Sequence, residues 1–206
     1  MPSERVTSSE VSPLDFRCTA CGNCCRTLRV AVTALDVLRL TRATGQAATE
    51  LVTWLAPDQV DMAGEPQSFV ELGEGRRLLV LRQVDGACVL LGKDERCSAY
   101  AARPRDCRAF PFDFDSAPRE GDAGVARRRL RLLPLQGCDF ASDGRNDVRT
   151  LSAEDQARWQ ELRAYQALVA RWNRGAWHRR RLRKNLGKAR EFLEFALRDS
   201  DLQTPR

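Results

Sequence analysis

Apolar positions between residues 33 and 55 are spaced as in two short helices. The segment Thr33-Ala-Leu-Asp36 resembles a capping box with aspartate in place of glutamate, so it predicts a helix that begins near Thr33. Gly45 has the position of a glycine that follows the last helical turn. A second short helix is expected over Ala47–Leu55, and Pro57 ends it. The apolar residues of these helices are Leu35, Val37, Leu38, Leu51, Trp54 and Leu55.

The middle of the chain has the pattern of short strands separated by turn residues. Gly73-Glu-Gly75 is the turn between the first two strands, and Asp85-Gly86 precedes the third. These three strands predict a small antiparallel meander whose last strand carries Cys88. The predicted strands are Ser68–Leu72, Arg77–Arg82, Ala87–Leu91 and Arg127–Leu133.

The pattern becomes helical after the polar segment Ser142–Asp147. A helix is expected to open at Ser152-Ala-Glu-Asp155, with one apolar stripe that is typical of packing surface. A second helix is expected from about His178 to Leu197, and the two form a hairpin folded back on the preceding module. The stripe of the first helix is Trp159, Leu162, Tyr165, Leu168, Val169 and Trp172.

Together these elements predict a small, irregular α+β fold with a C-terminal helical hairpin. At 206 residues the chain fits one domain, or one domain with an appendage. We expect residues 1–15 to form a flexible tail, residues 16–147 to form the main domain, and residues 148–200 to form a helical extension packed on it.

The composition is that of a soluble globular protein, with 43% apolar and 30% charged residues. No apolar run approaches the roughly 20 residues that a membrane-spanning helix requires, so no membrane partner is expected. The first residues are polar and lack the apolar stretch of a secretory signal. A cytoplasmic location is therefore expected.

Positive charge is concentrated near the C-terminus. The formal net charge is +6, and Arg179–Arg190 contains seven basic residues and no acidic one. Such a segment can contact nucleic acid or an anionic surface. No groove-reading motif accompanies it, so a solvated helix face is the favoured interpretation and nucleic acid is the less favoured partner.

Eight cysteines are the unusual feature of the composition, and four of them lie within Cys18–Cys25. A cytoplasmic location argues against disulfides. The adjacent pair Cys24-Cys25 argues against them too, because neighbouring Cα atoms lie about 3.8 Å apart and disulfides usually need about 4.4–6.8 Å. Reduced thiols this close together are better explained as metal ligands.

The spacing Cys18-x2-Cys21-x2-Cys24 supplies three thiolates from one tight turn, with Gly22 relieving the backbone. Bacterial ferredoxins use this run on a four-iron cluster. Structural zinc more often uses two separated Cys-x2-Cys knuckles or histidines, and the one histidine here is His178 in the basic segment. Spacing therefore gives a [4Fe-4S] cluster or iron a slight advantage over zinc, which stays a close alternative.

The other four cysteines come from separate elements, so the fold must bring them to the site. Eight thiolates could satisfy two four-coordinate centres, or one cluster with a smaller site. The sequence does not assign particular cysteines to one metal. These four cysteines are Cys88, Cys97, Cys107 and Cys138.

Three motifs in this order resemble the YkgJ-like CxxCxxCC cysteine-cluster family, whose members are described as zinc- or iron-chelating proteins. They are Phe16-Arg-Cys18-Thr-Ala-Cys21-Gly-Asn-Cys24-Cys25, then Cys88-Val-Leu-Leu91, then Cys97-Ser-Ala-Tyr100-Ala-Ala-Arg103-Pro-Arg-Asp-Cys107-Arg108-Ala-Phe-Pro111. The resemblance covers roughly Phe16–Cys138. It implies that residues 16–147 form a metal-binding domain whose ligands are Cys18, Cys21, Cys24, Cys25, Cys88, Cys97 and Cys107, with Cys138 as the eighth.

The resemblance does not supply a reaction, so three function classes stay open and no catalytic residue is assigned. The first is a protein that stores, delivers or senses metal, or uses it structurally. The second is an iron–sulfur enzyme, either redox or methylase-like with S-adenosylmethionine, because a related cysteine module occurs in the flagellin lysine N-methylase. The third is a metal-stapled module that binds nucleic acid or a protein partner. The sequence does not decide the oligomeric state.

Charged residues near the cysteines have two interpretations each. Arg103, Arg105 and Arg108 bracket Cys107, where guanidinium groups could stabilise an anionic centre or only mark a bend and bind carbonyls. Asp113 and Asp115 could do acid–base work or bind a cation, but a role in a loop turn is favoured.

Overall fold

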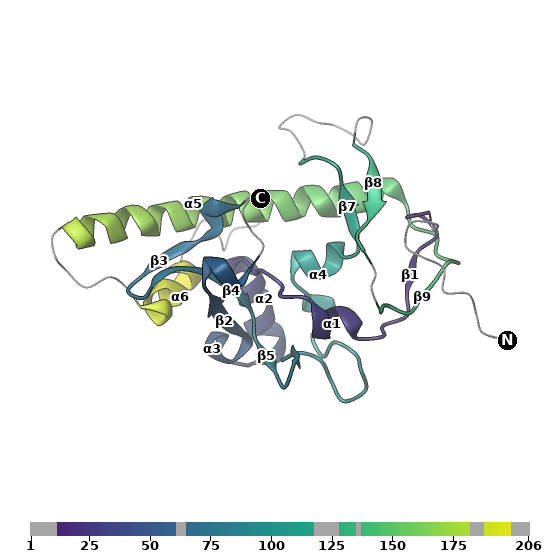
Figure 1. Ribbon diagram of the computed structural model, residues 1–206, viewed down its shortest axis with the longest axis horizontal. Coiled ribbons are helices and arrows are strands. Elements are labelled where there is room, and N and C mark those ends of the chain that lie inside the picture. Colours follow the sequence, from purple (N-terminus) through teal and green to yellow (C-terminus); the bar gives the residue numbers. More distant parts are fainter. Residues whose placement is uncertain (1–11, 61–64, 118–127, 135–136, 182–187, 199–206) are drawn as a thin grey trace.

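The computed structural model describes residues 12–60, 65–117, 128–134, 137–181 and 188–198, and for 177–181 it describes the backbone alone. Short helices and strands alternate along the first two thirds of the chain, and one helix of 34 residues and one of 10 follow (Figure 1). The predicted α+β class is therefore confirmed.

Helix α2 (Ala34–Thr44) has the predicted limits because both of its ends are capped. The Thr33 hydroxyl accepts the Asp36 N–H at 3.1 Å, and the Asp36 carboxylate accepts the Thr33 N–H at 2.9 Å. Gly45 ends the helix with φ of 71°, in the left-handed region that glycine tolerates. The helix buries Val37 and Leu40 completely.

The prediction of one helix over Ala47–Leu55 is wrong in its second half. Helix α3 (Ala48–Leu51) stops after one turn, and strand β2 (Val52–Leu55) pairs antiparallel with β4 (Gly75–Leu81). β4 also pairs with β3 (Val70–Leu72), so it is the centre of a three-stranded sheet in the order β2-β4-β3. Pairing with β4 satisfies the backbone of this β-branched and aromatic segment, and this tertiary gain outweighs the local helical pattern.

The hairpin around Gly73–Gly75 is confirmed, and a second hairpin turns at Asp85-Gly86. The predicted three-stranded meander is wrong, because this second hairpin does not extend the sheet and its last strand covers only Ala87–Cys88. In the second hairpin β5 (Gln83–Val84) pairs with β6 (Ala87–Cys88) as a separate two-stranded ladder. Both turn residues have positive φ, 50° at Asp85 and 79° at Gly86. This turn places Cys88 opposite Gln83.

Two further ladders lie at the other end of the molecule (Figure 1). β7 (Phe112–Phe114) pairs with β8 (Leu130–Leu132), which confirms a strand within the predicted segment 127–133. β1 (Arg17–Cys18) pairs with β9 (Phe140–Ala141), a ladder that the sequence pattern does not predict. Just beyond β9, the Gly144 N–H donates to the Asp15 carbonyl at 2.7 Å.

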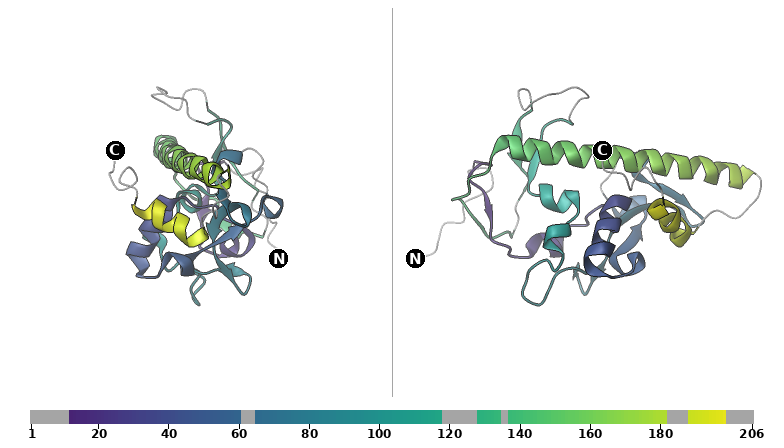
Figure 2. Two further views of the ribbon diagram at one scale, coloured as in Figure 1. Left: turned by 90° about the vertical axis from the view of Figure 1, so that its left-hand side faces the viewer. Right: turned by 180° about the vertical axis from the view of Figure 1, so that it is seen from behind.

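The C-terminal hairpin consists of α5 (Val148–Arg181) and α6 (Ala189–Arg198). α5 runs along one side of the molecule for most of its length, and α6 lies between it and α2 (Figure 2). The predicted starts at Ser152 and His178 are both wrong, since the first helix begins four residues earlier and extends through 178–181. The basic segment Arg179–Arg190 and the His178 side chain lie largely outside the described residues.

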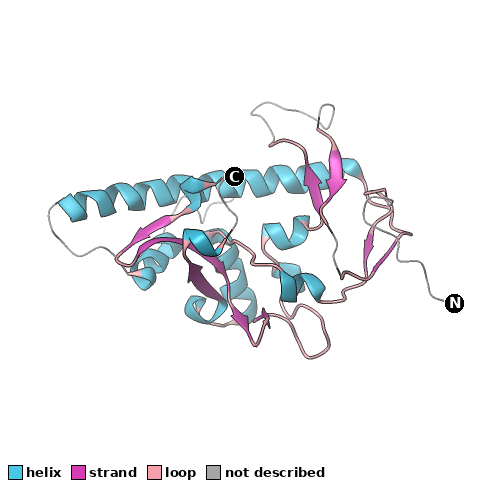
Figure 3. Ribbon diagram, in the orientation of Figure 1, coloured by secondary structure: helices cyan, strands magenta, loops and turns pink. Residues whose placement is uncertain are grey.

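Figure 3 distinguishes the helices from the strands, and the core between them has two main parts. One packs α2 and α3 against the sheet, with Leu40, Leu51 and Leu79 fully buried. The other packs the hairpin against β3, where Trp172 meets Phe192 edge-on at 5.4 Å. The remaining helices are α1 (Asn23–Thr27), α4 (Arg105–Ala109), η1 (Pro57–Gln59), η2 (Pro66–Ser68) and η3 (Tyr100–Ala102). Among the described residues, no helix is long and apolar enough to cross a membrane.

Candidate metal centre

All eight cysteines line one cleft, which has a volume of about 1080 Å³. They come from β1, α1, β6, α4 and the loops beside them, which extend from the β1–β9 ladder past α1 and α4 to the β5–β6 hairpin (Figure 1). Each of them is a free thiol, and none forms a disulfide. The structure therefore brings together every cysteine that the sequence singled out, and their role as metal ligands stays a prediction.

The turn of the first cluster depends on Gly22. This residue has φ of 70° and immediately precedes α1. A Cβ atom there would lie 2.8 Å from an Arg26 Nη atom and 3.1 Å from the Glu95 carbonyl oxygen. In the same turn, the Ala20 N–H points at the Cys18 Sγ atom at 3.3 Å, the backbone arrangement that stabilises a thiolate.

Cys24 and Cys25 are neighbours on α1, and their side chains are hydrogen-bonded. This hydrogen bond lowers the pKa of the Cys24 thiol and raises the pKa of Cys25. A more distant influence on Cys24 is the positive charge of Arg103, which also lowers its pKa. Two adjacent thiols that line one cleft thus differ in pKa, and Cys24 loses its proton more readily than Cys25.

Cys138 reaches the first cluster because β9 pairs with β1. Its Sγ atom lies 3.7 Å from Cys21 Sγ. Nearby, the Thr19 hydroxyl donates to the Asp139 carbonyl, which fixes the two segments side by side. Partial burial, together with the contact to Cys21, raises the pKa of the Cys138 thiol to about 12.

Cys88, Cys97 and Cys107 approach the cleft from the opposite side. All three are half-buried and pack against the same core cluster, which includes Leu90. An isolated bridge between Leu91 and Cys97, with the Ser98 N–H donating to the Leu90 carbonyl at 2.8 Å, holds Cys97 beside the Cys88 hairpin. Burial raises the pKa of both Cys88 and Cys107.

The thiols line the cleft but do not converge on a single position where a metal ion could bind. Among the described residues, no group of three or more histidine, cysteine, aspartate or glutamate side chains is gathered closely enough to hold a metal ion. Thiolates are the donors that suit zinc, iron and iron–sulfur clusters. The donor set therefore fits these metals, and the side chains must rotate inward to bind one.

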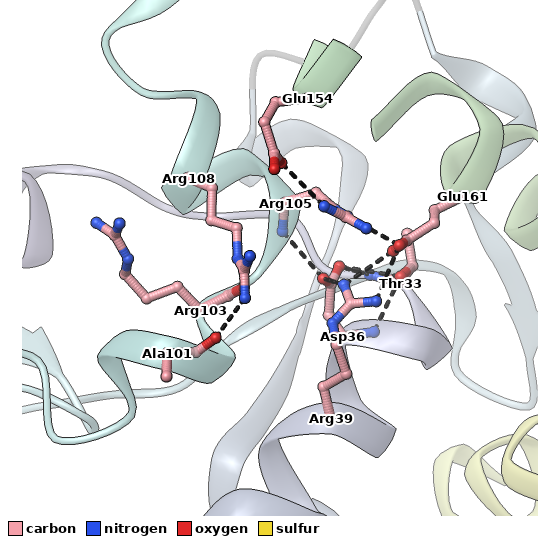
Figure 4. Close-up of polar contacts among 9 residues, drawn as sticks. All are labelled: Thr33, Asp36, Arg39, Ala101, Arg103, Arg105, Arg108, Glu154 and Glu161. Carbon is pink, nitrogen blue, oxygen red and sulfur yellow. Dashed lines mark hydrogen bonds and ion pairs between the residues drawn. The ribbon is translucent and has the colours of Figure 1, made fainter. Parts of the chain in front are cut away.

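The three arginines around Cys107 have different roles. Arg103 stacks on the Tyr100 ring at 3.7 Å and acts on Cys24 through its charge. Arg108 donates to the carbonyls of Arg103 and Ala101, as the structural interpretation of this residue predicted (Figure 4). Arg105 does not line the cleft and binds Glu154 and Glu161 instead, so of the three it is Arg103 that supports the prediction of charge beside a thiolate.

Arg105 belongs to a network of partly buried charges that holds α4 in place (Figure 4). The Arg105 backbone N–H donates to Asp36 Oδ1 at 3.0 Å, and its guanidinium binds Glu161 at 2.8 Å and Glu154 at 2.9 Å. Arg39 donates two further hydrogen bonds to Glu161, at 2.9 and 2.8 Å. The network joins α2, α4 and α5, and α4 carries Cys107. Sequence reasoning missed it because Glu161 lies 122 positions from Arg39.

Asp113 and Asp115 both bind partners in or beside the β7–β8 ladder. Asp113 pairs with Arg131 across the ladder, with hydrogen bonds of 2.9 and 2.6 Å. Asp115 accepts the Arg129 N–H at 3.0 Å. These contacts agree with the favoured structural role.

Comparison with known proteins agrees with the chemistry of the cleft. The profile of the CxxCxxCC family, described as "Putative zinc- or iron-chelating domain", matches residues 17–127, which is just over half of the chain. No curated protein and no solved structure matched. The matched segment contains seven of the eight cysteines and ends before Cys138. This chain therefore belongs to the CxxCxxCC family of zinc- or iron-chelating domains.

Proposed function

We propose that this protein binds zinc or iron through the thiolates of its cleft, and that the bound metal completes this end of the fold. Family membership supports metal chelation, and eight free thiols around one cleft supply the ligands. The observation that carries the proposal is the Cys21–Cys138 separation of 3.7 Å. Two sulfurs bound to one tetrahedral zinc ion at about 2.3 Å lie about 3.8 Å apart.

The same separation bears on the kind of centre. In a four-iron cluster each cysteine binds a different iron, so the thiolates spread further apart than two ligands of one metal atom. The contact between Cys21 and Cys138 therefore favours a metal atom held by both sulfurs. The spacing Cys18-x2-Cys21-x2-Cys24 still supports the iron–sulfur alternative, which the following experiment distinguishes.

Metal and acid-labile sulfide should be measured after anaerobic purification from cells supplied with both zinc and iron. We expect stoichiometric metal without sulfide. Brown protein with iron and sulfide in similar amounts would establish a cluster instead. Protein without zinc or iron, and unable to take up either ion after reduction of its thiols, would refute chelation. The variant Arg190→Gln, on an exposed part of α6, is the control and should retain full metal content.

The size of the cleft supports a second candidate, an enzyme that uses S-adenosylmethionine beside the metal. Its volume of about 1080 Å³ exceeds the need of metal ions alone and is slightly above the range of about 300–1,000 Å³ that is usual for small-molecule sites. Calorimetry of the metal-loaded protein with S-adenosylmethionine tests this candidate. Absence of binding heat would remove methyl transfer and leave chelation unaffected.

A further inference from the structure

We propose that the eight cysteines are divided between two four-thiolate centres. The first consists of Cys18, Cys21, Cys24 and Cys138, and the second of Cys25, Cys88, Cys97 and Cys107. This division rests on the proposed metal binding and adds the number of centres and the ligands of each.

The first centre is built on the β1–β9 ladder. Cys18 lies in β1 opposite Phe140, so the ladder brings Cys138 alongside the start of the first cluster. The 3.7 Å separation between Cys138 and Cys21 already matches one edge of a tetrahedral site. Cys18 and Cys21 therefore lie on the side of the cleft that carries Cys138.

The second centre lies on the core side of the cleft. Cys88, Cys97 and Cys107 pack on one apolar cluster, to which no cysteine of the first group belongs. Packing thus separates these three residues from the β1–β9 end. The first group takes Cys24 because Cys24 continues the Cys18-x2-Cys21 spacing, and the remaining cysteine, Cys25, completes the second group.

Helix α1 is the junction of the two groups. It packs against β6, which carries Cys88, and its preceding turn carries Cys21. Successive side chains on an α-helix differ in direction by about 100°, so Cys24 and Cys25 can serve different metals from one helix. The adjacent pair can therefore supply one ligand to each of two neighbouring centres.

The charge of the cleft agrees with two centres. A divalent ion with four thiolates carries two negative charges, so two such centres carry four. The charged side chains that line the cleft, apart from the cysteines, are seven arginines and the three carboxylates of Glu95, Asp106 and Asp113. The formal excess is four positive charges, which would balance both centres.

The test is the zinc stoichiometry of single and paired serine variants, measured by native mass spectrometry after anaerobic zinc loading. We expect about two zinc ions in the unaltered protein and about one in Cys138→Ser and in Cys107→Ser. The pair Cys21→Ser with Cys138→Ser, within one centre, should still hold one zinc. The pair Cys138→Ser with Cys107→Ser, across both centres, should hold none.

Cobalt substitution checks that the remaining centre is intact. Each single variant should show the sulfur-to-cobalt absorption of an intact four-thiolate site for its one remaining ion. If Cys107→Ser does not fold, Cys97→Ser replaces it, because both belong to the second centre. One metal in the unaltered protein, or loss of all zinc from either single variant, would overturn the division while leaving chelation intact. No metal in the unaltered protein would refute the proposed function itself, and the division with it.

Discussion

Gly22 shows how a single residue sets the geometry of the cysteine turn. Its left-handed backbone and the close approach of Glu95 leave no room for a side chain. The sequence pointed to this glycine because it interrupts a run of cysteines. The Glu95 carbonyl on its other side was not predictable, since it comes from a loop over seventy positions away whose path depends on the Leu91–Cys97 bridge.

We expect Gly22→Ala to destabilise the protein and weaken zinc binding. An alanine in the left-handed region costs about 1–2 kcal/mol, and the contact with the Glu95 carbonyl at 3.1 Å adds to this cost. Gly45→Ala is the matched control, because Gly45 has nearly the same φ and nothing within 4 Å of its virtual Cβ. Urea denaturation of the zinc-loaded protein measures the stability of both variants. Equal losses in the two variants would contradict the role of the contact.

Helix α5 stabilises the cleft although it contributes no cysteine. Glu161 on α5 binds Arg39 and Arg105, and through Arg105 it fixes the short helix that carries Cys107. A second contact has the same effect, since Arg158 on α5 pairs with Asp106 at 3.3 Å. The hairpin therefore has a specific structural role, which its apolar stripe alone did not indicate.

The variant Glu161→Gln should lower the free energy of unfolding by about 1–3 kcal/mol, because two largely buried guanidinium groups lose their shared carboxylate. The Glu161 side chain is 14% exposed. Glu194→Gln is the control, since its partner Arg190 is 82% exposed and the pair contributes about 0.5 kcal/mol or less. If both variants unfold at the same urea concentration, the network does not hold α4.

The start of α5 should make stability depend on pH. Asp147 accepts the N–H and the hydroxyl of Thr150, both at 2.9 Å, and these hydrogen bonds lower the pKa of its carboxyl. A lowered folded-state pKa contributes stability at neutral pH that is lost as pH falls from about 4 through the folded-state value. The melting temperatures of the unaltered protein and of Asp147→Asn should therefore converge as the pH falls below about 4. A difference that stays constant with pH would contradict this.

Local signals predicted some elements well and missed others for a physical reason. The capping box at Thr33 and the turn at Asp85-Gly86 are complete within a few residues, so the sequence alone identified them. Val52–Leu55 became a strand because β4 lay beside it, and the two-residue β1–β9 ladder exists because residues distant in sequence meet. Such pairings leave no periodic pattern in either segment.

At the scale of the whole molecule, metal and fold should depend on each other. The cysteines were predictable as a set from their spacing and family resemblance, and all eight line one cleft. Their division was not predictable, because it follows from which elements pack on the core and which lie on the β1–β9 ladder. The cysteines extend from Cys18 to Cys138, so metal bound by them would join segments that are far apart in the sequence.

Removal of metal should therefore unfold more than the cleft. We expect a chelator that strips zinc under reducing conditions to lower the melting temperature and to increase amide exchange in α1, α4 and β9, since metal-binding free energy is also folding free energy. The sheet β2-β4-β3 should keep its protection, because its core is apolar. An unchanged melting temperature in the stripped protein would contradict this coupling.

The meeting of β1 with β9 has a consequence for synthesis of the protein. Cys21 and Cys138 lie 117 positions apart, so at about 5–20 residues per second the first waits roughly 6–23 s for the second to be made. Throughout that interval the N-terminal thiols are exposed to oxidants and to other metals on an unfinished chain. The supply of metal and the reducing power of the cell would then matter most during translation, before Cys138 has been made.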